Sequence, residues 1–294
     1  MLSQKINFHT HSTFCDGKNS PEEMILAAIE KGFSALGFSS HCMYPIDPKF
    51  YTPEDSIWHI PPENIKSYST EILRLKEKYA EKIKIYLGFE ADYFESPEIG
   101  SAIPHKQNFS DFSPDYLIGA VHFVNTEKGF FNVDNKTEVV KENLIKLYSK
   151  PDGKIDGKKA TCDYFEAERL MLKKGNFDII AHADLIRIRN TVLHFFSEEE
   201  SWYKEQLKET AKAIAKAGVI AEINTGAIAR GNMDDTYPSH NFLKLLYENG
   251  VPVCINSDAH TTSNLDAAFD RAAENARRAG YTELVYPHNN IIKL

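Results

Sequence analysis

The stretch Ile6-Asn7-Phe8-His9-Thr10-His11 decides the fold, because it joins a short apolar run to two side chains that commonly bind metal ions. Short apolar runs are typical of buried strands, and barrel enzymes place their chemistry at the carboxyl ends of their strands. The arrangement recurs at residues 35–38 before His41, 85–89 before Glu90, 116–121 before His122, 179–181 before His182, and 253–255 before Asp258 and His260, while the run at 219–223 contains Glu222. The pattern predicts seven strands with one polynuclear metal site at their C-terminal ends.

Helical segments separate these strands. Ser20-Pro21-Glu22-Glu23 combines an N-cap serine, a proline at the first helical position and a glutamate at the capping-box position, which predicts the start of a helix. A helix between successive strands favours a parallel sheet, and repeated right-handed crossovers close most easily into a barrel. Further helices are expected at about residues 64–80, 137–148, 163–174, 198–217, 240–248 and 265–279. The fold class is therefore α/β, with a barrel architecture.

No linker, low-complexity tract or repeat of fixed period divides the chain. Residues 1–294 are expected to form a single domain, because a chain of this length with 42% hydrophobic residues can build one large core. Three polar segments, at residues 42–62, 96–114 and 151–159, are expected to be long loops on one rim of the barrel.

The composition argues against several classes of protein. The 34 Lys and Arg residues are outnumbered by 42 Asp and Glu residues, and no basic stripe is present, so nucleic acid is not an expected partner. The sequence has no secretory signal and no window approaching 18 apolar residues, which predicts a cytoplasmic protein without a membrane segment. The four cysteines lack Cys-x-x-Cys spacing and are expected to be reduced thiols. The oligomeric state is left open.

The polar residues after the strands are candidate metal ligands. His9 and His11 lie two apart, and residues i and i+2 of an extended segment face the same side, so their imidazoles could share one ion; a pair of ordinary loop histidines is the alternative. Glu90 follows an apolar strand, where a carboxylate is costly to bury unless it is paired or bound to a cation. The complete set of candidates is His9, His11, Asp16, His41, Glu90, His122, His182, Asp258 and His260.

The ligand types suggest which ions would bind. Imidazole and carboxylate ligands without thiolates suit Zn²⁺, Fe²⁺ or Mn²⁺, and nine ligands exceed one tetrahedral site, so two or three ions are expected. Taken alone, Asp16 next to Gly17 would be a turn residue, and His41 would be a core or capping residue. The remaining histidines are interpreted as surface residues; they are His59, His105, His194, His240 and His288.

These residues lie in recognisable motifs. In chain order, from residue 6 to about residue 280, they are His9-Thr10-His11 with Asp16-Gly17, Ser40-His41, Gly88-Phe89-Glu90, Val121-His122, Ala181-His182 and Asp258-Ala259-His260. Together they resemble the polymerase-and-histidinol-phosphatase (PHP) family, and within it the histidinol-phosphate phosphatases. The resemblance implies a distorted (β/α)7 barrel and hydrolysis of L-histidinol phosphate to L-histidinol and phosphate in histidine biosynthesis.

The resemblance also implies three divalent ions. His9, His11, Glu90 and Asp258 would hold the first, Glu90 would bridge to a second held by His122 and His182, and Asp16, His41 and His260 would hold the third. A hydroxide that bridges two ions would attack the phosphorus of a small phosphomonoester. Catalytic roles are accordingly expected for Glu90, Asp258 and His41.

A cationic phosphate clamp from late loops is implied as well. The candidates are Arg230, after Asn224-Thr225-Gly226, and Arg187 or Arg189, after His182, because arginine binds phosphate oxygens in a bidentate manner. The choice between Arg187 and Arg189 stays open, and a surface position is the alternative for each arginine. Glu222 could face the barrel interior as a substrate contact or as a support for the ligands, with an internal salt bridge as the alternative.

Two other functions are weighed against the phosphatase. A PHP phosphoesterase acting on nucleotides or phosphodiesters could use the same ions, but base-stacking aromatic residues interleaved with basic residues are missing. A binding module built on an inactive barrel should have lost several ligands. Every ligand position here carries a residue that can bind metal, which favours an enzyme.

Overall fold

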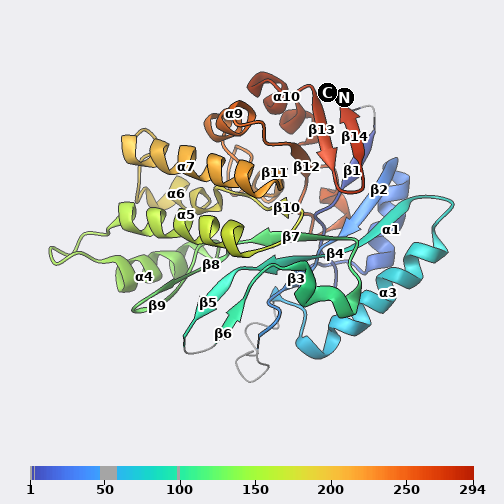
Figure 1. The fold of residues 1–294 in the computed structure, drawn as a ribbon, viewed down its shortest axis with the longest axis horizontal. Coiled ribbons are helices and arrows are strands. Elements are labelled where there is room, and N and C mark those ends of the chain that lie inside the picture. The colour runs from blue at the N-terminus through green and yellow to red at the C-terminus, as the bar shows by residue number, and fades with distance from the viewer. Residues whose placement is uncertain (1, 3, 47–57, 98–99) are drawn as a thin grey trace.

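A computed structural model describes residues 2, 4–46, 58–97 and 100–294. Its main sheet contains parallel strands in the order β1-β2-β4-β7-β10-β11-β12, and helices surround it (Figure 1). The strands are β1 (Lys5–Asn7), β2 (Phe33–Phe38), β4 (Lys84–Asp92), β7 (Tyr116–Ala120), β10 (Ile179–Ile180), β11 (Ile220–Asn224) and β12 (Val253–Asn256). The short strand β3 (His41–Cys42) pairs with β4. The predicted α/β barrel with seven strands is confirmed.

The barrel closes where β1 meets β12. The backbone N–H of His11 donates to the carbonyl of Ala259 at 2.9 Å, and the N–H of Ala259 donates to the carbonyl of His9 at 3.3 Å. The side-chain Oδ1 of Asn256 accepts from the N–H of Phe8 at 2.7 Å. The first and last motifs of the chain are therefore neighbours at this seam.

The helices begin where local capping chemistry allows. α1 (Pro21–Glu30) starts after Ser20, whose hydroxyl accepts from the N–H of Glu23 while the Glu23 carboxylate accepts from the N–H of Ser20, so the predicted capping box is confirmed. α5 (Gly157–Lys174) starts at residue 157 rather than 163, because Asp156 caps it by accepting from the N–H of Lys159. The other α-helices in the described part of the chain are α3 (Ile65–Lys78), α4 (Thr137–Tyr148), α6 (Asn190–Leu193), α7 (Ser201–Ala217), α8 (Gly226–Ala229), α9 (His240–Glu248) and α10 (Phe269–Ala279).

The described helices are too short or too polar to cross a membrane. Among those in the described part of the chain, none combines the length and the apolar character that a transmembrane span requires.

Hairpins that were not predicted lie outside the barrel. They pair β5 (Phe94–Ser96) with β6 (Gly100–Ala102), β8 (Phe123–Thr126) with β9 (Gly129–Asn132), and β13 (Glu283–Tyr286) with β14 (Asn290–Lys293). The prediction of a loop at 96–114 was wrong in part, because β6 and the 3-10 helix η3 (Lys106–Phe112) fall within it. Residues 47–57 of the loop predicted at 42–62 lie outside the described residues.

The barrel interior is packed around one aromatic ring. Every residue of β7 is buried, as expected for a parallel strand that is covered on both faces. The ring of Tyr116, at the start of β7, lies so close to Gly37 and Gly88 that a Cβ atom at either position would clash with it. The Tyr116 hydroxyl donates to the carbonyl of Phe8 at 2.6 Å, which fixes the ring in place. The two glycines therefore provide the space that this side chain needs.

Candidate metal centre

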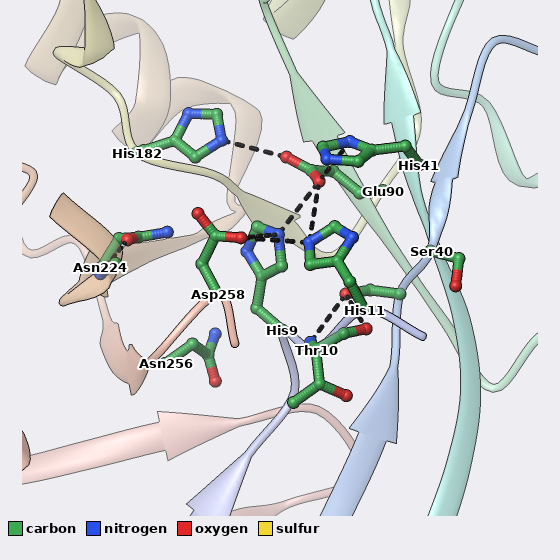
Figure 2. A network of polar contacts seen from close by, with 12 residues as sticks. His9, Thr10, His11, Ser40, His41, Glu90, His182, Asn224, Asn256 and Asp258 are labelled. Carbon is green, nitrogen blue, oxygen red and sulfur yellow. Dashed lines mark hydrogen bonds and ion pairs between the residues drawn. The ribbon is translucent and has the colours of Figure 1, made fainter. Parts of the chain in front are cut away.

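All nine predicted ligands lie together at the C-terminal edge of the barrel. Three groups have potential ligand atoms within 4.8 Å of one another: His9, His11 and Glu90; His41, Glu90 and His122; and His11, Asp16, His41 and His260. His182 and Asp258 adjoin them, with Nε2 of His182 lying 3.0 Å from Oε1 of Glu90 and Oδ1 of Asp258 lying 3.0 Å from Nε2 of His11. Figure 2 shows the side chains of His9, His11, His41, Glu90, His182 and Asp258 pointing toward one another. This cluster is the candidate metal centre.

Glu90 is the middle of the centre. It lies in β4, is completely buried, and directs its two carboxylate oxygens to different sets of imidazoles. Its Oε2 lies 3.0 Å from Nε2 of His9 and 2.8 Å from Nδ1 of His41. Its Oε1 lies 3.0 Å from Nε2 of His182 and 3.4 Å from Nε2 of His122. This is the arrangement expected of a carboxylate shared between two ion sites.

Asp16 belongs to a more open part of the centre. Its Oδ2 lies 3.0 Å from Nε2 of His260, and its Oδ1 lies 3.9 Å from Nε2 of His41. The ring of His11 stacks on that of His260, with 4.1 Å between the ring centroids. Asp16, His41 and His260 are each partly exposed, whereas His9, His11 and Glu90 are fully buried. A third ion here would be the one most accessible to substrate.

The buried atoms of these residues fit divalent cations. Within the described part of the chain, seven of the nine residues have a buried nitrogen or oxygen atom that makes no hydrogen bond; these atoms are His9 Nε2, His11 Nε2, Asp16 Oδ1, His41 Nδ1, Glu90 Oε2, His182 Nδ1 and Asp258 Oδ1. A buried polar atom left unsatisfied costs about 1–3 kcal/mol. Ions coordinated by imidazole and carboxylate would satisfy most of them, and this donor set suits Zn²⁺, Fe²⁺ or Mn²⁺.

Interactions within the centre shift the pKa values of its carboxylates and imidazoles. Burial alone would raise the pKa of Glu90, but the imidazoles of His41 and His9 hold it well below its usual value. Burial alone would lower the pKa of His41, but Glu90 raises it to about 9. Burial and the neighbouring His260 lower the pKa of His11 to about 3, so its imidazole is neutral and able to bind metal. A bound cation would displace the proton on His41.

Glu222 accepts hydrogen bonds from two of the candidate ligands, His9 and His182. It is completely buried in β11, and its Oε1 accepts from Nδ1 of His9 at 2.7 Å. Its Oε2 accepts from the backbone N–H of His182 at 3.1 Å and from the side chain of Asn224 at 2.8 Å. Because these bonds occupy both oxygens, the geometry favours a role in orienting His9 over a contact with substrate.

Asp92 and His59 were missed by the sequence reasoning. Asp92 is fully buried at the end of β4, where its Oδ1 accepts from Nδ1 of His122 at 2.6 Å and its Oδ2 accepts from Nε2 of His59 at 2.8 Å. The prediction that His59 is a surface residue was wrong, since it is only 3% exposed. The two-residue spacing of Glu90 and Asp92 could have identified Asp92, because alternate residues of a strand face the same side.

Arg230 reaches the centre. It follows α8, and its guanidinium donates to Oδ2 and to the backbone carbonyl of Asp258, both at 2.9 Å. The same group lies 3.4 Å from Nδ1 of His260. The side chain remains 32% exposed, so it can donate to an anion bound at the edge of the centre.

Arg187 and Arg189 are engaged elsewhere. Arg187 is buried among acidic groups and donates to Asp235 at 2.8 Å and to Glu198 at 3.1 Å. Arg189 donates to the backbone carbonyls of Asn135 at 2.6 Å and Asp134 at 2.9 Å. These contacts connect loops and give no support to a phosphate-binding role for either arginine, which stays a prediction.

A separate cavity of about 960 Å³ lies between the β5–β6 and β8–β9 hairpins and α5. Tyr93, Phe123 and Tyr148 contribute to its wall, and none of the nine candidate ligands lines it. The chemistry of the candidate metal centre is therefore not located in this cavity.

Comparison with known proteins agrees with the fold and the motifs. A PHP domain model matches residues 7–226. The "Probable histidinol-phosphatase" of Schizosaccharomyces pombe is 28% identical over 290 residues, which cover 95% of this chain and 88% of that protein. The crystal structure of HisK from Listeria monocytogenes has a TM-score of 0.76 at 21% identity and covers 91% of this chain and 99% of its own. That of histidinol phosphate phosphatase from Lactococcus lactis, complexed with zinc, L-histidinol and phosphate, has a TM-score of 0.66 at 19% identity and covers 98% of both chains. The chain belongs to the PHP domain family.

Proposed function

We propose that this protein is a histidinol-phosphatase, a phosphoric monoester hydrolase that converts L-histidinol phosphate to L-histidinol and phosphate. The observation that carries the proposal is the position of Glu90, whose two carboxylate oxygens face separate sets of imidazoles in one buried centre, with Arg230 at its edge. The full-length similarity to a relative named for this activity supports the choice of substrate. The role would place the protein in histidine biosynthesis, in the cytoplasm, with residues 1–294 as one phosphoesterase domain.

The proposal includes three divalent ions. The Lactococcus lactis protein was crystallised with zinc, which supports zinc as the metal. The nine residues would hold them as the resemblance implies, with Glu90 shared between two ions. When bound, such ions act as Lewis acids and activate water at neutral pH. The protein orients the side chains that would hold the ions. Glu222 accepts a hydrogen bond from Nδ1 of His9 and so turns Nε2 of His9 toward Glu90.

Arg230 would bind the phosphate. Asp258 holds its guanidinium in a defined orientation through two bonds, and a guanidinium forms charge-assisted bonds with phosphate oxygens. Asp258 thus acts both as a ligand, through the oxygen near His11, and as the group that positions the clamp. His41 and His260 are both partly exposed beside Asp16, so the leaving group would face this side of the centre.

The substrate is tested by measuring phosphate release from L-histidinol phosphate after reconstitution with Zn²⁺ or Mn²⁺. A nucleotide monophosphate and bis(p-nitrophenyl) phosphate serve as comparison substrates. We expect kcat/KM of about 10⁴ M⁻¹s⁻¹ or more for histidinol phosphate, within the ordinary range of enzymes, and far lower values for the others. A preference for the diester or the nucleotide would reassign the substrate while keeping the centre.

Replacing Arg230 by Met should lower kcat/KM for the monoester by about 10²–10³, the usual loss when one donor to a developing anion is removed. The matched variant is Arg189→Met, which removes a guanidinium bonded to two backbone carbonyls. Steady-state kinetics and thermal unfolding of both variants are compared. Arg189→Met should lower the unfolding temperature and have little effect on kcat/KM. An equal loss of kcat/KM in the two variants would assign Arg189 to the clamp.

A further inference from the structure

We infer that Asp92 is a positioning residue of the metal centre: it holds the imidazole of His122 with Nε2 turned toward Glu90, and His59 holds Asp92 in turn. The inference rests on the proposed metal site, and it is independent of the proposed substrate. None of the sequence motifs contains this pair, and His59 comes from outside the barrel strands.

Two hydrogen bonds hold the Asp92 carboxylate in one orientation. Its carboxylate is completely buried, and each oxygen accepts one imidazole N–H, from His122 at 2.6 Å and from His59 at 2.8 Å. A carboxylate buried without partners would be costly, so the two imidazoles and the acid stabilise one another. Neither oxygen of Asp92 is left without a hydrogen bond, in contrast to Glu90 and Asp258 in the centre itself.

The bond to Asp92 decides which nitrogen His122 offers. With Nδ1 donating to the carboxylate, Nε2 is the atom that can offer a lone pair to a metal ion, and it lies 3.4 Å from Oε1 of Glu90. A histidine that binds metal usually donates its other N–H to a carboxylate or carbonyl, which fixes the ring and raises its basicity. Asp92 gives His122 such a partner.

The other oxygen of Glu90, Oε2, also faces an imidazole that is held by a buried carboxylate. His9 donates from Nδ1 to Glu222 at 2.7 Å, and its Nε2 lies 3.0 Å from Oε2 of Glu90. The two oxygens of Glu90 thus face two imidazoles that are each backed by a buried carboxylate. Glu222 comes from β11 and Asp92 from β4, so the supports are built on different strands.

His59 links Asp92 to the segment that precedes the 3-10 helix η2 (Pro62–Asn64). The backbone N–H of the next residue, Ile60, donates to the carbonyl of His41 at 2.9 Å, so this part of the chain is attached to the barrel by the His59 side chain and by the adjacent backbone. The rings of His59 and His41 lie 5.8 Å apart, measured between centroids. Loss of His59 would leave one oxygen of Asp92 buried without its partner and would free the carboxylate to turn away from His122.

The test is zinc affinity, measured by competition with a chromophoric chelator and by the number of ions retained after dialysis. Asp92→Ala should weaken one zinc site by about 10–100-fold, the usual effect of removing such a support. Asp92→Asn keeps an acceptor for Nδ1 of His122 and should lose less. The matched control is Asp115→Ala. Asp115, which precedes β7, accepts from the N–H of Leu87 in β4 at 2.8 Å and so joins these two strands at the end opposite to Asp92. It should lower the unfolding temperature and leave zinc affinity unchanged.

His59 is tested by a double-mutant cycle on the same measurement. If His59 acts through Asp92, His59→Ala weakens the same zinc site, and the double variant is no weaker than Asp92→Ala alone. Additive losses would remove His59 from the inference, and wild-type zinc affinity in Asp92→Ala would overturn it entirely. A wild-type protein that binds zinc but does not hydrolyse L-histidinol phosphate would contradict the proposed substrate alone.

Discussion

Replacement of Glu90 by Gln is expected to lower kcat by on the order of 10³-fold or more, while the protein stays folded. Five imidazoles, those of His9, His11, His41, His122 and His182, contact the two oxygens of this carboxylate. An amide would remove the negative charge and would turn an NH₂ group toward one pair of nitrogens, so neither ion site would keep its shared ligand. Losing one preorganised charge contact alone costs about 10²–10³ in kcat, and Glu90 serves two sites.

The Glu90→Gln variant is compared with Glu205→Gln, which removes a carboxylate on the exposed face of α7. Steady-state kinetics, zinc content and circular dichroism are measured for both proteins. Wild-type turnover in Glu90→Gln would contradict the trinuclear centre. Loss of the folded spectrum would show instead that Glu90 is needed for the stability of the barrel.

Replacement of Gly88 by Val should destabilise the protein by at least about 3 kcal/mol, because overpacking a filled core commonly costs about 1–3 kcal/mol and a branched side chain needs more room than one methyl group. The added atoms would meet the ring of Tyr116. That ring cannot withdraw without breaking the bond from its hydroxyl to the carbonyl of Phe8. The free energy of unfolding is measured by urea titration.

Two comparisons separate this clash from a general effect of removing glycine. Gly153→Ala, in an exposed turn with φ 80° and nothing near the added Cβ, should cost only about 1–2 kcal/mol for the left-handed backbone. Combining Gly88→Val with Tyr116→Ala should cost less than the sum of the two single losses, because the second change removes the ring. Strict additivity would mean that Tyr116 is not the obstacle.

The gathering of the candidate ligands at one edge of the barrel could be predicted, because it depends on local sequence. An apolar strand delivers the next polar residue to the edge of the barrel, so Glu90 follows from residues 85–89 without knowledge of the rest of the fold. The capping box at Ser20 is equally local. For the same reason all seven predicted strands are found in the barrel, with boundaries that differ by a few residues at most.

The features that escaped prediction depend on distant parts of the chain. His59 lies beyond any strand, and its burial against Asp92 follows from the path of a whole segment rather than from a periodic pattern. The β8–β9 hairpin consists of two four-residue strands, Phe-Val-Asn-Thr and Gly-Phe-Phe-Asn, in which apolar and polar residues do not alternate. The engagement of Arg187 with Asp235 likewise joins two loops whose distance apart the sequence does not encode locally.

The seam between β1 and β12 determines when during synthesis the chain could bind the proposed metal ions. Phe8 and Asn256, which are bonded across the seam, are separated by 248 residues. At a synthesis rate of about 5–20 residues per second, roughly 12–50 s pass between the emergence of His9 and that of Asp258 from the ribosome. During that interval the first histidines have no carboxylate partner from the last motif, so a nascent chain cannot form the complete centre. Loading of the proposed metal ions would therefore be completed only after translation has passed the last strand.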